Sequence, residues 1–172
     1  MIRKRFVPIA VAAAVLGGAA VSTTPASANT SDGYISGTGD WTNDWSDEGP
    51  ISASSYSYSN AAAGWQAILW ADEYLTSTTE IDCRFGSTTT GATKQWQTDH
   101  LGSAYANGSA GPQTLARAES YMYANSSGQY IYPGRGGRYV TFTRNSSGQW
   151  GMYHGTSDHH LLSYTYANFL SC

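Results

Sequence analysis

The chain has 172 residues and a formal net charge of −3 at pH 7, from nine Lys and Arg against twelve Asp and Glu. This length is enough for one ordinary domain. The acidic balance argues against a nucleic-acid partner, because phosphate binding needs a basic face.

The first 28 residues have the three parts of a secretory signal peptide. A basic start at 3–5 precedes an apolar run over 6–21, and residues 26–28 have the A-x-A pattern of a cleavage site. A membrane anchor is the alternative, but the run contains Pro8 and is shorter than the ~20 residues of a spanning helix. Cleavage would remove three basic and no acidic residues, leaving 144 residues with a net charge of −6. We therefore expect a secreted protein, extracellular or cell-wall associated, with no membrane contact after cleavage.

Residues 29–60 are rich in Ser, Gly and Thr and predict a linker or a loosely held arm. Trp41 and Trp45 stand out in this segment and can fold back onto the domain. Five acidic residues also lie here, but their spacing fits no EF-hand calcium loop. The expected state of these carboxylates is a solvated acidic segment.

The spacing of apolar and capping residues predicts three helices, over 60–75, 87–100 and 112–121. Asn60 is a good N-cap for the first helix, and Ser87 or Thr88 can cap the second. Pro112 suits the first turn of the third helix, where its missing N–H costs nothing.

After residue 121 the spacing of apolar residues changes from the period of helices to that of strands. We predict strands over 130–132, 138–144 and 149–154. The sequence Asn-Ser-Ser-Gly-Gln occurs at 125–129 and again at 145–149, each time where a turn opens into an aromatic strand. This is a local hairpin repeat rather than a solenoid. The segment 161–172 can form a further strand or a short helix.

The sequence has two cysteines, Cys83 and Cys172. Export would place them in an oxidising compartment, where an even count suggests a disulfide. A metal site or a reactive thiol is the alternative, but two cysteines alone make a poor metal site and no C-x-x-C is present. The bond would tie the C-terminus to the middle of the chain.

Two similar half-motifs lie between residues 65 and 118. Residues 82–89 read D-x-x-F-G-x-x-T, and residues 107–114 echo them as N-G-x-x-G-P-x-T. Asp82 and Asn107 can each set a tight turn by bonding nearby backbone. The first half-motif follows a Trp-Gln pair at 65–66, and the second follows another at 96–97.

With these motifs the chain resembles the peptidoglycan-binding-domain-like family. That family's three-helix repeat carries an L-Q helix, a D-G-x-F-G-x-x-T loop, an A-x-x-x-F-Q helix and a closing D-G-x-x-G-P-x-T. Here Cys83 replaces the first loop glycine and Asn107 replaces the closing aspartate, while Asp72 and Glu73 stand where the family has an apolar residue and a glycine. The resemblance implies an α+β protein with a small three-helix peptidoglycan-binding-like core at 61–120 and a C-terminal antiparallel β-hairpin extension at 121–172 packed on it.

The resemblance implies non-catalytic binding of peptidoglycan, both glycan and stem peptide, alone or beside a partner hydrolase, with no cofactor. The candidate ligand-binding residues near the two loops are Asp82, Arg84, Gln97, Tyr105 and Asn107. Arg84 can pair bidentately with a stem-peptide carboxylate, or it can form a surface ion pair with Asp82 or Glu80. Gln97 can contact ligand or hold loop backbone.

Two other functions remain open from the sequence. A hydrolase or other secreted enzyme would use the cluster His154, Asp158, His159 and His160. A zinc site needs three or four converging ligands, whereas adjacent histidines in a strand point oppositely, so a polar loop without metal is expected there. A protein-interaction or inhibitor module would instead use an aromatic patch of Tyr130, Tyr132, Tyr139 and Trp150.

Overall fold

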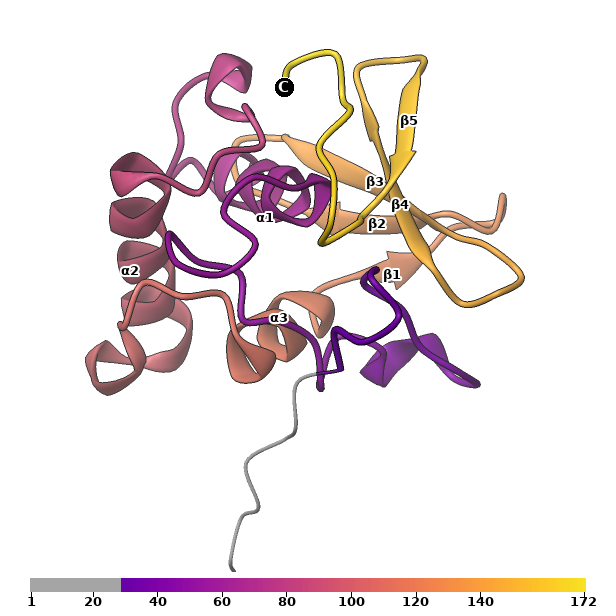
Figure 1. Ribbon diagram of the computed structural model, residues 1–172, viewed down its shortest axis with the longest axis horizontal. Helices are drawn as coiled ribbons and strands as arrows, with labels where there is room; N and C mark the ends of the chain where they lie inside the picture. Colours follow the sequence, from indigo (N-terminus) through magenta and orange to yellow (C-terminus); the bar gives the residue numbers. More distant parts are fainter. Residues whose placement is uncertain (1–28) are drawn as a thin grey trace, which may run out of the picture.

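The computed structural model describes residues 29–172, so the predicted signal peptide lies outside the described residues. The helices are α1 (Asn60–Ala71), α2 (Ser87–Leu101) and α3 (Pro112–Glu119), with short 3-10 turns η1 (Trp41–Asn43), η2 (Thr78–Glu80) and η3 (Ser103–Tyr105). The strands are β1 (Tyr123–Ala124), β2 (Tyr130–Pro133), β3 (Tyr139–Arg144), β4 (Trp150–His154) and β5 (Asp158–Leu161). They form one antiparallel sheet in the order β1-β2-β3-β4-β5, with α1 beside β2 and β3 (Figure 1). The α+β class is confirmed, while the likeness of the helices to a peptidoglycan-binding core stays a prediction.

The helices begin close to their predicted starts, but two caps differ from the prediction. Ser59, not Asn60, caps α1 by accepting a hydrogen bond from the Ala62 N–H. The Asn60 side chain reaches the C-terminal tail instead, where it donates to the Leu161 carbonyl. Gly86 precedes α2 without a side-chain cap, so neither predicted hydroxyl caps this helix. All of α1 except Trp70 is buried, which makes it the central helix.

The repeated Asn-Ser-Ser-Gly-Gln sequence forms the same turn twice. In each copy the Asn side-chain oxygen accepts from the backbone N–H groups two and four residues later, at Asn125 and at Asn145. In each copy the Gly lies at positive φ, which glycine adopts without strain. The predicted hairpin repeat is confirmed.

The segment 158–161 forms strand β5, which corrects the expectation of a polar loop around the histidines. Beyond it, the predicted strand or short helix at 161–172 is absent from the described chain apart from the last residue of β5. The predicted Cys83–Cys172 disulfide is present and spans 89 residues of sequence. None of the described helices is long and apolar enough to cross a membrane.

The segment before α1 packs into the core, which corrects the interpretation of residues 29–60 as a loosely held arm. Ile35, Trp45 and Ile51 are fully buried. The Trp45 ring meets the rings of Phe142 and Trp150 edge-on, with centroids 5.3 and 5.5 Å apart. The arm therefore covers the part of the helix-facing side of the sheet where Phe142 and Trp150 are buried.

Candidate functional site

Gln66, on the buried face of α1, holds the first predicted loop. Its Nε2 donates to Asp82 Oδ1 at 2.8 Å, to the Arg84 carbonyl at 3.0 Å and to Thr89 Oγ1 at 3.0 Å. Its Oε1 accepts from the Cys83 N–H at 3.0 Å. One side-chain amide thus satisfies several polar groups of this turn, which a bridge between Tyr58 and Arg84 also holds from the other side.

Gln97, on α2, repeats this arrangement in the second loop. Its Nε2 donates to Asn107 Oδ1, the Ser109 carbonyl and Thr114 Oγ1 at 3.2, 2.9 and 2.9 Å. Its Oε1 accepts from the Gly108 N–H at 2.8 Å. Gln97 is 1% exposed, so the interpretation as a structural bond to the loop holds in this structure.

The two loops also share their backbone shape. Cys83 and Gly108 occupy equivalent positions and both have positive φ, at 64° and 79°. A glycine adopts this conformation without strain, whereas a cysteine does so only when the surrounding structure holds it. At Cys83 the disulfide and the bond to Gln66 supply that constraint.

The five predicted ligand-binding residues do not form one cluster. Gln97 and Asn107 bond to each other, and Asp82 bonds to Gln66, so these three polar groups are engaged inside the protein. Arg84 is exposed and stacks over the Tyr58 ring, with Cζ 4.3 Å from its centroid, so the surface ion pair with Asp82 or Glu80 is not formed. Tyr105 is half-exposed beside a shallow hollow between α2 and α3.

The candidate histidine cluster at β4 and β5 centres on Asp158. Its carboxylate lies 2.9 Å from His160 Nε2 and 4.0 Å from His154 Nδ1, and it accepts from the Leu170 N–H at 2.7 Å. The neighbouring His159 points to the other face of the sheet and bonds Thr143 Oγ1 at 2.7 Å, as predicted for adjacent strand residues. Among residues 29–172 no three His, Cys, Asp or Glu side chains lie close enough to hold a metal ion.

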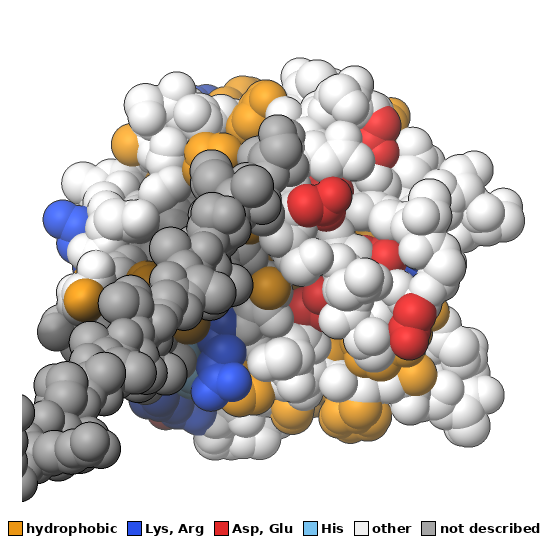
Figure 2. All heavy atoms as spheres, turned by 90° about the horizontal axis from the view of Figure 1, so that it is seen from below, with side chains coloured by type: hydrophobic (Ala, Val, Ile, Leu, Met, Phe, Trp, Pro, Cys, Tyr) orange, Lys and Arg blue, Asp and Glu red, His pale blue; other side chains and the backbone are white. Residues whose placement is uncertain are grey.

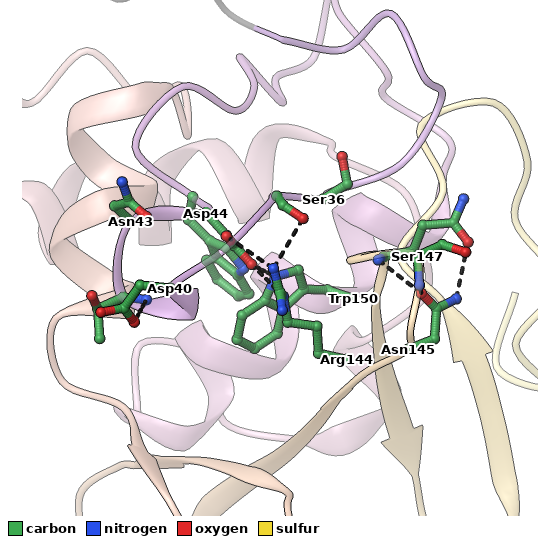
Figure 3. Close-up of polar contacts among 12 residues, drawn as sticks. Ser36, Asp40, Asn43, Asp44, Arg144, Asn145, Ser147 and Trp150 are labelled. Atoms are coloured by element: carbon green, nitrogen blue, oxygen red, sulfur yellow. Dashed lines mark hydrogen bonds and ion pairs between the residues drawn. The ribbon is translucent and has the colours of Figure 1, made fainter.

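Carboxylates of the N-terminal arm form the densest polar network (Figure 3). Asp44 Oδ2 accepts from Arg144 Nε at 2.6 Å and from Trp150 Nε1 at 2.8 Å, and all three side chains meet between the arm and the sheet. Asp44 and Glu48 are buried, so the expectation of a wholly solvated acidic segment is corrected. Figure 2 views the molecule from below, and most of the acidic side chains visible in that view lie on one half of the surface.

Two buried carboxyls hold the arm in place. Glu48 accepts from the Ser36 N–H at 2.8 Å and from the Tyr164 hydroxyl at 2.6 Å, and Glu119 accepts from the Trp45 N–H at 3.2 Å. Burial raises the pKa of each carboxyl to about 8. These groups are therefore mostly protonated at neutral pH and serve as structural contacts between the arm and the body.

The predicted aromatic patch is wrong in its membership. Tyr132 and Trp150 are buried on the helix-facing side of the sheet, and Tyr130 is partly buried against Trp41. Of the four, Tyr139 alone is well exposed, at 62%. Strand pairing explains this, because the position opposite Tyr132 is Val140, which leaves Tyr139 on the other face.

Two pockets meet at the turn 134–138, which joins β2 to β3. The larger, about 620 Å³, lies between the C-terminal half of α1 and the ends of β3 and β4. The smaller, about 320 Å³, lies over β1 and β2. Gly137, Arg138 and Tyr139 line both pockets. Trp70, Tyr123 and Tyr153 in these linings are not predicted from the sequence, because only strand pairing and the position of α1 bring them to one end of the sheet.

Comparison with known proteins finds no matching family model and no significant match among curated proteins or solved structures.

Proposed function

We propose that this protein is a secreted, non-catalytic module that binds bacterial cell-wall peptidoglycan. The observation that carries the proposal is the pair of glutamine-held loops. The residues that define the resemblance to the peptidoglycan-binding-domain-like family, such as Gln66 with Thr89 and Gln97 with Thr114, also contact one another in space. The motif therefore corresponds to a physical unit rather than to a chance string of residues.

The contacts of the histidine cluster favour a binding protein over a hydrolase. Asp158 holds two histidines of the sheet and the backbone of the C-terminal tail, which is a structural task. A retaining or inverting glycosidase would need two opposed carboxyl groups across a cleft. The larger pocket has no Asp or Glu in its lining.

The net charge of the exported chain indicates which kinds of contact would supply the binding affinity. With a net charge of −6 after residue 28, attraction to anionic wall polymers is unfavourable. Hydrogen bonds and stacking on exposed aromatic side chains would supply the affinity instead. The Cys83–Cys172 disulfide suits the oxidising compartment that a secreted protein enters.

Co-sedimentation with purified, insoluble sacculi tests the proposal. The chain from Asn29 onward, in its oxidised form, should pellet with sacculi at micromolar concentration and be released by soluble peptidoglycan fragments. Dye release from labelled wall, measured in the same samples, should stay at the level of buffer alone. Protein that remains in the supernatant would overturn peptidoglycan binding, and dye release would favour the hydrolase.

A further inference from the structure

The geometry points to a binding site for a linear polysaccharide strand at the turn 134–138, with the two pockets as successive subsites and Tyr139 between them. This inference rests on the proposed function and deepens it. It assigns the glycan strand of peptidoglycan, rather than the stem peptide, as the ligand. It also places the site at the end of the sheet, away from the two glutamine-held loops.

The larger pocket has an apolar floor and a polar, aromatic rim. Ile81, Val140 and Met152 are buried in its lining, while Trp70 and Tyr153 retain exposed surface. Sugar rings present an apolar C–H face and hydroxyl groups at their edges, and tyrosine and tryptophan match both because they combine a flat apolar body with a polar tip. A volume of about 620 Å³ lies within the usual range for ligand pockets.

The smaller pocket continues the same chemistry on the other side of the turn. Tyr123, 52% exposed, and Tyr139 line it together with Ile131 and Pro133. Strand pairing places Tyr123 opposite Ile131, and Pro133 opposite Tyr139, so these four side chains share the outer face of the sheet. The two tyrosines lie on an exposed face and are not part of the core. Their rings can therefore serve as a stacking surface for a ligand.

Glycine occupies three of the five positions of the turn between the pockets, at 134, 136 and 137. A side chain at Gly137 would point into open space, with no atom within 4 Å. Hydrogen-bond partners for the N–H groups of Gly136 and Gly137 are lacking within residues 29–172. A polymer can therefore cross from one pocket to the other and accept hydrogen bonds from this backbone.

Charge selects among possible ligands for this site. Neither pocket has an acidic residue in its lining, although the exported chain carries twice as many acidic as basic residues. Arg138 lines both pockets, and its Nη1 is fixed by the carbonyls of Trp70 and Leu75 at 2.8 and 3.3 Å. The Glu73 carboxylate lies next to Gly136 at the edge of the turn, but it is not part of either lining. A held cation in linings that contain no Asp or Glu favours a neutral sugar chain or one with carboxylate substituents.

The test compares three variants in two binding assays. Oligomers of β-1,4-linked N-acetylglucosamine serve as the glycan probe, and sacculi serve as the whole ligand. Tyr139→Ala should weaken binding to both by at least about tenfold, whereas Tyr139→Phe should keep the stacking surface and bind like the parent. Tyr166→Ala is the matched control, because that side chain is also exposed, at 37%, but lies outside both pockets.

Oligomer length tests the two subsites separately. Longer oligomers should bind more tightly than the disaccharide, and Tyr123→Ala should abolish this gain while leaving disaccharide binding unchanged. If Tyr139→Ala binds sacculi as tightly as the parent, the inference is overturned and peptidoglycan binding stands. If the parent protein itself fails to bind sacculi, the proposed function fails and this inference fails with it.

Discussion

Replacing Gln97 by alanine should destabilise the protein strongly, although the substitution removes no charge and little apolar surface. The side chain makes four hydrogen bonds in a buried setting, three from Nε2 and one to Oε1. Alanine would leave the Gly108 N–H without its partner and remove one of the two donors to the Ser109 carbonyl, which also accepts from the Gly111 N–H. Burying a polar group without a partner costs free energy, because its hydrogen bonds to water are not replaced.

The magnitude follows from the number of bonds. Each contributes about 0.5–1.5 kcal/mol net, so four amount to roughly 2–5 kcal/mol, after allowing for partial rescue by water. This is a large part of the 5–15 kcal/mol by which domains are typically stable. The melting temperature should fall by roughly 4–20 °C, at about 2–4 °C per kcal/mol for a domain of this size.

Urea unfolding followed by tryptophan fluorescence measures the effect, and the chain offers two matched comparisons. Gln66→Ala should lose a similar free energy of unfolding, because Gln66 makes the same four kinds of bond in the first loop. Gln113→Ala, on the exposed side of α3, should change it by less than about 0.5 kcal/mol. A loss below about 1 kcal/mol for both Gln66→Ala and Gln97→Ala would refute the idea that these amides hold the loops.

Three further predictions concern the disulfide and the buried carboxyls. Reduction of Cys83–Cys172 should lower the free energy of unfolding by about 4–5 kcal/mol in the chain-entropy model, measured in urea with and without dithiothreitol. Arg144→Met should cost about 3–5 kcal/mol in the same assay, because it leaves a buried carboxylate unpaired. Because the folded-state pKa values of Glu48 and Glu119 are raised to about 8, their contribution to stability is complete below about pH 4.5 and is lost as the pH rises through 8. Urea midpoints should therefore fall across this window, and less so in Glu48→Gln; a flat profile for the parent would contradict the assignment.

The elements that local sequence specifies were predicted well. The three helices, three of the strands and the twin hairpin turns follow from apolar period, proline placement and Asx turns, which act over a few residues. The short strand β1 and the strand β5 were missed. A two-residue strand carries no period, and the polar sequence at 158–161 becomes a strand because β4 provides a partner.

The candidate site was only partly predictable. The motif residues were recognised, but Asp82, Gln97 and Asn107 are engaged in loop structure, which depends on distances across the fold rather than on spacing in the chain. The apolar residues of the acidic, Ser-rich arm follow neither the spacing of a helix nor that of a strand. The sequence therefore predicted a loosely held segment. Its burial depends on Trp45 filling the space beside Phe142 and Trp150, about one hundred residues later.

The sequence by itself determined the secondary structure of the central segments, the disulfide and the two equivalent half-motifs, because these rest on short-range backbone chemistry and on residue identity. Tertiary structure decided which aromatic side chains are buried. The strand register turns Tyr132 inward and Tyr139 outward, and α1 brings Trp70 to the same end of the sheet. A one-residue shift of β3 against β2 would turn Tyr139 inward, to the same face as Tyr132. The exposed tyrosine surface is therefore a property of the folded sheet, whereas the loops are a property of the motif.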